Sequence, residues 1–237
     1  MSLELLLLIV GAYLFGSIPT AYIAGKWLKG VDIRRYGSGN VGGSNVYRKV
    51  ARWAVVPVGL FDVSKGAAPI LVAQRLDYGL PEQVVVGLAA IIGHNWSLYL
   101  RFNGGRGIGT TLGVLLLLAP RELLAFASVA LFGVVLRQVA LAVGLAMTTV
   151  PVVSLGLGEP TAITLGGAGM VVLMVIKRLL ANRAMIPGSG TRREILLNRL
   201  LLDRDIRSRE AWIHRVPPGA ASLPPPPERE EPFGPDS

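Results

Sequence analysis

Two glycine-rich segments hold the side chains best suited to binding a phosphate group. The first covers residues 37–48 and reads GSGNVGGSNVYR. Glycine lets a backbone turn sharply and present its amides to an anion, and Ser38, Asn40 and Asn45 add hydroxyl and amide donors. Arg48 ends the segment with a guanidinium group, which can donate two parallel hydrogen bonds to one phosphate. The composition also suits an ordinary flexible loop, but Arg48 favours an anion site.

The second glycine-rich segment covers residues 103–111, reads NGGRGIGTT and leads directly into an apolar run. Unpaired backbone amides at a helix N-terminus, together with the charge of Arg106, can bind an anion. No lysine followed by serine or threonine stands at the spacing of a P-loop, which argues against nucleotide hydrolysis. The alternative is a helix start that glycine makes flexible, in which the charge of Arg106 only fixes the orientation of the span in the membrane.

Two further motifs place polar side chains within apolar surroundings. Asp62 and Lys65 stand three apart in FDVSKG, so on a helix they share a face and can pair. His94 and Asn95 lie in GHNW, near the end of another apolar run. Ionisable groups at membrane depth are costly and therefore candidates for function. A structural ion pair and a hydrogen-bonded anchor are the respective alternatives.

Several kinds of chemistry are disfavoured by what the sequence lacks. It has no cysteine and no G-x-S-x-G motif, so neither a cysteine nucleophile nor a serine-hydrolase elbow is present. With only two histidines, a metal site is not expected. The polar residues are mostly phosphate-type donors. Such a site would bind two phosphorylated molecules and orient them for direct transfer between them.

The surrounding elements are predicted to be membrane-spanning helices. The chain is 51% hydrophobic and only 16% charged, with a mean hydropathy of +0.52. A helix needs roughly 20 mostly apolar residues to cross a bilayer. We expect an all-α, polytopic integral membrane protein with about seven such helices, some short or broken, at residues 3–25, 53–73, 82–100, 107–119, 123–136, 138–157 and 161–176.

Charges between these apolar runs predict how the chain is oriented in the membrane and what its basic residues contact. Basic joints alternate with joints that are neutral or acidic, and short cytoplasmic loops are the ones enriched in Lys and Arg. This pattern predicts an external N-terminus and a cytoplasmic C-terminus. The net charge of +9 therefore indicates contact with lipid headgroups, not with nucleic acid, because the basic residues stand between apolar runs.

The composition divides the chain into three parts. Residues 1–183 form the predicted membrane-embedded domain, and residues 184–215 are expected to hold a cytoplasmic amphipathic helix. Residues 216–237 include eight of the sixteen prolines and are predicted to form a disordered tail.

In these motifs the chain resembles the bacterial membrane glycerol-3-phosphate acyltransferases that use acyl phosphate as donor. The matching motifs are GSIPTAY at residues 16–22, GSGNVGGSNVYR, FDVSKG, GHNW, and GGRG followed by two threonines. The resemblance implies a helical membrane fold in the bacterial inner membrane and a site that faces the cytoplasm. It implies attack of the glycerol phosphate 1-hydroxyl on a long-chain acyl phosphate, which yields lysophosphatidate and phosphate without metal, cofactor or coenzyme A. A monomer is expected, with an acyl-phosphate-forming enzyme as a candidate partner.

The resemblance also implies three groups of site residues. Those implied in catalysis are Ser38, Arg48, Arg106 and Asn182. Those implied to bind substrate phosphate are Gly37, Gly39, Asn40, Asn45, Gly104, Gly105, Gly107, Thr110 and Arg137. The supporting residues are Asp62, Lys65, His94 and Asn95. Arg106 stands where the family usually has lysine, which preserves the charge but changes the shape.

The resemblance weakens toward the C-terminus, and two alternatives follow. The serine-rich helix start that usually follows an arginine is absent after Arg137, and IKRLLANR lacks the histidine of the family's last motif. A divergent paralogue that acylates another phosphorylated acceptor is one alternative. A non-enzymatic lipid or anion transporter is the other, since glycine-broken helices also bind anions in carriers.

Overall fold

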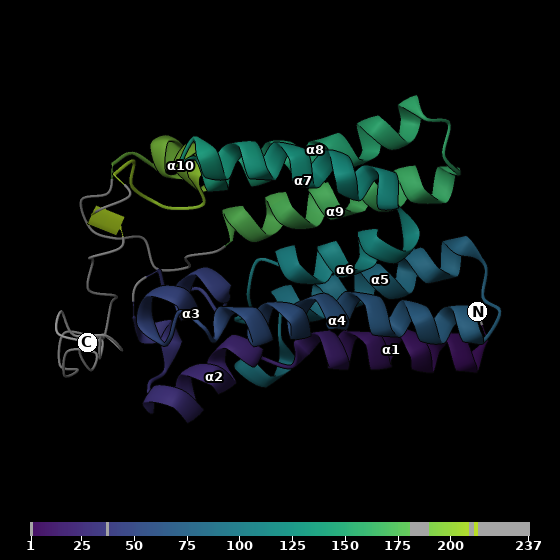
Figure 1. Cartoon of the computed structure of the whole chain (residues 1–237), viewed down its shortest axis with the longest axis horizontal. Helices are drawn as coiled ribbons and strands as arrows, with labels where there is room; N and C mark the ends of the chain where they lie inside the picture. Colours follow the sequence, from purple (N-terminus) through teal and green to yellow (C-terminus); the bar gives the residue numbers. More distant parts are fainter. Residues whose placement is uncertain (1, 37, 181–189, 209–210, 213–237) are drawn as a thin grey trace, which may run out of the picture.

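The computed structural model describes residues 2–36, 38–180, 190–208 and 211–212. In these ranges every regular element is helical (Figure 1), which confirms the predicted all-α class. The helices are α1 (Leu3–Ser17), α2 (Thr20–Lys29), η1 (Ile33–Arg35), α3 (Gly43–Lys49), α4 (Val55–Arg75), α5 (Leu80–Asn95), η2 (Leu98–Leu100), α6 (Ile108–Leu118), α7 (Pro120–Val135), α8 (Val139–Gly156), α9 (Thr161–Leu179) and α10 (Arg192–Leu202).

The long helices alternate in direction, so the loops gather at two opposite ends of the bundle (Figure 1). One end holds α2, α3, α10 and the joints between α5 and α6 and between α7 and α8. The other end holds the start of α1 and the joints α4–α5, α6–α7 and α8–α9. Both glycine-rich segments therefore lie at the same end of the molecule.

Five helical segments of the described chain are long and apolar enough to cross a membrane. They are Leu3–Lys29, Val55–Arg75, Leu80–Leu100, Val139–Gly156 and Thr161–Leu179, and Ile108–Leu118 is a shorter apolar helix. Together with the 16-residue α7 these segments agree with the prediction of a polytopic membrane protein that has short spans.

The first predicted span is broken. α1 ends at Ser17 and α2 begins at Thr20, and Pro19 between them has no amide hydrogen to continue the backbone ladder. α2 then carries Lys26 and Lys29 in its last turn, at the end of the bundle that holds α3 and α10. The break matters for the site because it brings Thr20 next to α4.

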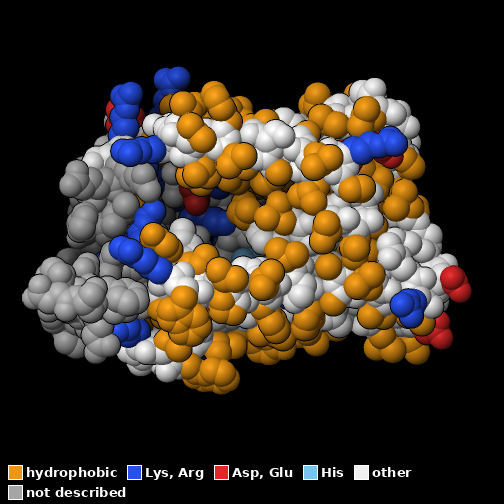
Figure 2. Space-filling view, in the orientation of Figure 1, with side chains coloured by type: hydrophobic (Ala, Val, Ile, Leu, Met, Phe, Trp, Pro, Cys, Tyr) orange, Lys and Arg blue, Asp and Glu red, His pale blue; other side chains and the backbone are white. Residues whose placement is uncertain are grey.

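Large apolar side chains cover much of the bundle's outside. Examples on α7 and α8 are Leu124, Leu131, Val135 and Leu155, each at least 65% exposed. Figure 2 shows hydrophobic side chains across the middle of the visible face and charged ones mainly toward its two ends. Helices satisfy their own backbone groups, so such a surface can face hydrocarbon.

Glycines on both helices allow α4 and α6 to approach backbone to backbone. A Cβ at Gly66 of α4 would stand 2.0 Å from the carbonyl oxygen of Thr110 on α6, and one at Gly113 would stand 2.0 Å from that of Val63. Small residues are typical of such crossings within membranes. This contact fixes the start of α6 against α4.

After α9, helix α10 packs back onto the bundle. α10 begins with a capping box in which Thr191 and Glu194 exchange side-chain and backbone hydrogen bonds. The helix contacts α8 and α9. The predicted boundary at residue 183 and the predicted tail at 216–237 lie outside the described residues.

Candidate functional site

A cavity of about 460 Å³ opens at the end of the bundle that holds the glycine-rich segments. Figure 2 shows a hollow there with basic and acidic side chains at its mouth. Within the described chain five arginines line the cavity, and each comes from a different segment: Arg48, Arg106, Arg137, Arg178 and Arg204. The fold thus gathers cationic groups that the sequence separates by up to 156 positions, from Arg48 to Arg204.

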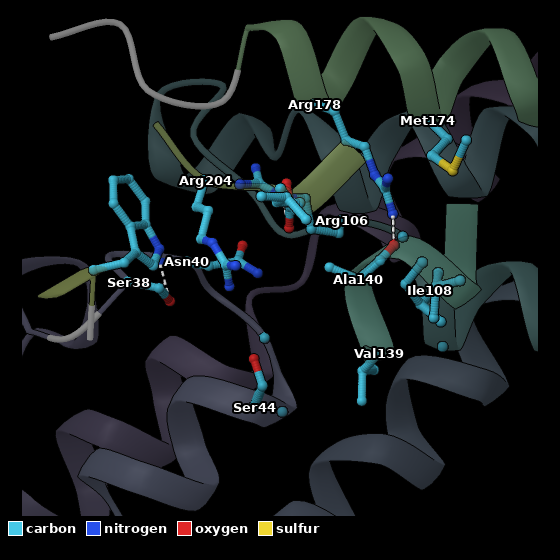
Figure 3. A pocket seen from close by; sticks show the side chains of 18 of the residues that line it. Ser38, Asn40, Ser44, Arg106, Ile108, Val139, Ala140, Met174, Arg178 and Arg204 are labelled. Carbon is cyan, nitrogen blue, oxygen red and sulfur yellow. Dashed lines mark hydrogen bonds and ion pairs between the residues drawn. The ribbon is translucent and has the colours of Figure 1, made fainter. Parts of the chain in front are cut away.

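The first glycine-rich segment forms one wall of the cavity. Ser38 and Asn40 line it from the loop (Figure 3). Arg48 lines it from α3. Gly39 has a φ of +68°, which glycine adopts without strain. The Oδ1 atom of Asn40 is buried without a recorded hydrogen bond. An acceptor in that condition can receive a hydrogen bond from a bound molecule.

Asn45 has a different place from the one its predicted role suggests. Its Nδ2 lies 3.0 Å from the carbonyl oxygens of Ile33 and Tyr36 and 3.1 Å from that of Asn40, and donates to all three. The residue is 2% exposed and does not line the cavity. Asn45 therefore holds the loop closed, and that loop in turn presents Ser38 and Asn40.

The second glycine-rich segment brings Arg106 to the cavity at the start of α6. Gly107, with a φ of +73°, caps the helix and lines the cavity beside Arg106. Gly104 and Gly105 pack on α5 instead, and the Gly105 amide donates to the carbonyl oxygen of His94 at 3.0 Å. Cβ atoms at these two glycines would overlap His94, so the glycines act here through close packing.

Thr110 and Asn95 are buried beneath this segment. Thr110 is fully buried where α6 crosses α4, and Asn95 is 1% exposed below Gly107. Neither lines the cavity, and the Oδ1 of Asn95 and the Oγ1 of Thr110 have no recorded hydrogen-bond partner.

Four side chains with ionisable or hydroxyl groups, two of which line the cavity, form one network. Lys65 Nζ donates to Asp62 Oδ1 at 2.5 Å and to Thr20 Oγ1 at 2.9 Å, and Thr20 Oγ1 donates to the same carboxylate at 2.6 Å. His94 Nδ1 lies 3.7 Å from Asp62 Oδ1. Asp62 and His94 line the cavity, whereas Lys65 does not. The predicted pair of Asp62 and Lys65 is thus present and buried.

Three charged residues that line the cavity were not singled out from the sequence. Arg178, near the end of α9, donates from Nη1 to the Leu200 carbonyl and from Nη2 to the Ala140 carbonyl, both at 2.6 Å. Its place in a basic joint after an apolar run was a usable signal. Asp203 and Arg204 come from the turn after α10, and no local pattern marks them.

Of the remaining predicted site residues, Arg137 lines the cavity from the joint before α8, in a left-handed conformation with φ +57°. Gly39 stays in the first loop without lining the cavity. Gly37 and Asn182 lie outside the described residues.

The cavity is lined by apolar side chains as well as by arginines. Ile108, Val139, Val143 and Met174 line it together with the arginines. Figure 3 shows Ile108, Ala140 and Met174 on the opposite side from Ser38 and Asn40. Guanidinium groups bind phosphate strongly, and apolar walls accept hydrocarbon. The site is therefore suited to molecules that bear a phosphate group and a hydrocarbon chain.

Comparisons with known proteins agree with this chemistry. Residues 6–186 match the family model described as glycerol-3-phosphate acyltransferase. Glycerol-3-phosphate acyltransferase 4 of Dehalococcoides mccartyi strain CBDB1 is 45% identical over 91% of this chain and 95% of its own length. Glycerol-3-phosphate acyltransferase 5 of D. mccartyi strain ATCC BAA-2266 is 44% identical with the same coverage.

The fold is also similar to solved structures of one integral membrane protein. The glycerol 3-phosphate form of PlsY (YgiH), a glycerol 3-phosphate acyltransferase, is 33% identical, with a TM-score of 0.67 over 78% of this chain and 96% of that one. Its lysophosphatidic acid form gives a TM-score of 0.69 at 30% identity and covers 90% and 100%. Motifs, fold and cavity agree, and the chain belongs to the family of integral membrane glycerol-3-phosphate acyltransferases.

Proposed function

We propose that this acyltransferase moves a long-chain acyl group from acyl phosphate to the 1-hydroxyl of glycerol 3-phosphate. The products are lysophosphatidate and inorganic phosphate. The observation that carries the proposal is the convergence of Arg48, Arg106, Arg137 and Arg178 on one cavity that is also lined by apolar side chains. Both substrates bear a phosphate, and one bears a hydrocarbon chain.

The reaction needs little from the protein beyond binding and charge. The 1-hydroxyl oxygen bonds to the acyl carbon, and the bond from that carbon to the bridging phosphate oxygen breaks. The electron pair leaves with the phosphate, and a phosphate oxygen takes the hydroxyl proton. Holding two reactants as neighbours can contribute about 7–11 kcal/mol to lowering the barrier. Arg48 and Arg106 would stabilise the developing oxyanion and the departing phosphate.

We assign the cavity end of the bundle to the cytoplasmic side of a bacterial inner membrane. That end carries Lys26, Lys29, Lys49 and Arg52 in addition to the arginines of the cavity. The opposite end is mainly acidic, with Glu4, Asp77, Glu82, Glu122 and Glu159 against Arg75 and Arg121. Basic segments stay on the cytoplasmic side.

Product analysis with purified full-length protein tests the proposal. Labelled glycerol 3-phosphate is supplied with either palmitoyl phosphate or palmitoyl coenzyme A. We expect lysophosphatidate from palmitoyl phosphate only, and loss of about two orders of magnitude or more in kcat/KM for Arg48→Ala and for Arg106→Ala, as for removal of an oxyanion-stabilising donor.

Arg75→Ala is the matched control because Arg75 ends α4 at the opposite end of the bundle and is exposed. Activity of that variant should equal that of the unaltered protein. Product formed from palmitoyl coenzyme A, or full activity of both cavity variants, would contradict the proposal.

A further inference from the structure

The turn that follows α10 contributes to the cavity although it lies beyond the part of the chain that matches the family model. That match ends at residue 186, whereas Leu202, Asp203 and Arg204 line the cavity. The wall of the site is therefore completed by a segment that lies beyond the match to the family model.

Asp203 forms an ion pair with Arg106. The Nε of Arg106 lies 2.7 Å from Asp203 Oδ1 and donates a hydrogen bond to Oδ2 at 2.9 Å. The two side chains are 15% and 23% exposed. To the described residues, Arg106 donates from Nε and makes no recorded hydrogen bond from Nη1 or Nη2. The carboxylate thus binds the Nε edge of the guanidinium, and Nη1 and Nη2 make no hydrogen bond to the described residues.

The turn that carries Asp203 is fixed to the bundle. Asp203 is the C-cap of α10 with a φ of +54°, and its amide donates to the Arg199 carbonyl. Arg199 pairs with the fully buried Asp205 at 2.7 Å and donates to the Leu179 carbonyl, at the end of α9, at 2.9 Å. Arg178 holds the Leu200 carbonyl from α9 as well. The position of the Asp203 carboxylate is therefore set by α9 and α10.

We propose that Asp203 is a positioning residue for Arg106. By binding Nε it fixes the plane of the guanidinium, so that Nη1 and Nη2 together face the phosphate group of a bound substrate. A planar guanidinium offers two-point recognition only when its orientation is right. This role rests on the proposed function, because it assumes a phosphate monoester in the cavity.

The opposite role makes the opposite prediction. If Asp203 occupied the place of the substrate phosphate, its neutralisation would free Arg106 and tighten phosphate binding. If Asp203 positions Arg106, the same change weakens binding. The sign of the effect on the affinity for phosphate therefore separates the two.

The test uses Asp203→Asn, which keeps the shape and removes the charge. The KM of each substrate, kcat, and the inhibition constant of inorganic phosphate are measured on the full-length protein. We expect a rise of about tenfold in the inhibition constant and in the KM of the substrate whose phosphate Arg106 binds, since hydrogen bonds to charged groups contribute at that level. The affected KM tells whether that substrate is glycerol 3-phosphate or acyl phosphate.

Asp77→Asn is the matched control. Asp77 also follows a helix in the left-handed conformation, with φ +55°, but it is exposed at the opposite end of the bundle. Its substitution should leave every constant unchanged. Asp203→Glu, which keeps the charge, should recover part of the loss, and a merely structural requirement for aspartate would not produce that recovery.

The same substitution in an Arg106→Lys variant tests whether Asp203 acts through the arginine. Lysine has no Nε–H on the side of a planar group, so Arg106→Lys removes the contact that Asp203 makes. In that background Asp203→Asn should change the inhibition constant by less than twofold. An unchanged or lower inhibition constant for Asp203→Asn in the unaltered background would overturn the proposal, and so would an equal effect in both backgrounds.

Failure of the proposed function gives a different result. Absence of product from acyl phosphate with the unaltered protein would refute the reaction. Calorimetric titration of inorganic phosphate into the unaltered protein and into Asp203→Asn would still measure the effect of Asp203 on Arg106.

Discussion

A methyl group at Gly66 is expected to separate α4 from α6 and thereby to damage the site. The Cβ of alanine would stand 2.0 Å from the Thr110 carbonyl oxygen and 2.9 Å from the Val114 nitrogen. Ordinary contact begins at about 3.4 Å, so the shortfall to the Thr110 oxygen is about 1.4 Å. Both obstacles are backbone atoms of a helix, which cannot rotate away as a side chain can.

The magnitude follows from two opposing effects. Alanine in place of a helical glycine favours the helix by about 0.5–1 kcal/mol. Overpacking a close contact costs about 1–3 kcal/mol and occasionally more. Separation by about 1 Å would also move Arg106, at the start of α6, relative to Asp62 on α4, and misplacement of that size can cost about 100-fold in rate. We expect Gly66→Ala to lower both the stability and kcat/KM.

Gly59→Ala is the matched control on the same helix, because a Cβ at Gly59 meets nothing within 4 Å. That variant gains the helix-favouring effect alone, so the two alanine variants should differ in free energy of unfolding by about 1–3 kcal/mol. The assay is thermal unfolding in detergent, followed by initial rates. Equal unfolding midpoints and equal kcat/KM for both variants would refute the account of the α4–α6 crossing.

Three other changes have definite expected outcomes. Lys65→Met leaves the Asp62 carboxylate buried without its ammonium partner, at a cost of about 3–5 kcal/mol, so unfolding should occur at a lower temperature. Adding Asp62→Asn should recover part of this loss of stability. No recovery would count against the ion pair. Thr191→Ala removes the N-cap of α10 at about 1 kcal/mol, so amide hydrogen exchange in residues 192–202 should accelerate while α4 and α5 keep their protection. Because the chain has no cysteine, Lys26→Cys and Asp77→Cys each create a single labelling site. An impermeant maleimide should label Asp77→Cys in intact cells and Lys26→Cys only after permeabilisation. The reverse pattern would invert the topology.

Helical spans and their order could be predicted from the sequence because lipid imposes a simple length rule on apolar runs. The break at Pro19 was not predicted: residues 3–25 are apolar enough to read as one span, and the effect of the proline depends on the packing of Thr20 against α4. Likewise α7 begins at Pro120 instead of residue 123, since proline suits the first helical position even beside charged neighbours.

The candidate site was predictable where one short segment holds its own donors. Ser38, Asn40 and Arg48 share a loop and a short helix, and the structure places all three on the cavity. Asp203 could not be found in this way. It meets Arg106 across 97 positions of sequence, through the return of α10 onto α8 and α9, and that return depends on tertiary packing.

We infer that both substrates occupy the arginine-lined cavity together and react without a covalent enzyme intermediate. Initial rates measured while glycerol 3-phosphate and palmitoyl phosphate are varied against each other test it most directly. We expect double-reciprocal lines that intersect, as for a ternary complex. Parallel lines, the pattern of a ping-pong reaction through an acyl-enzyme, would contradict it.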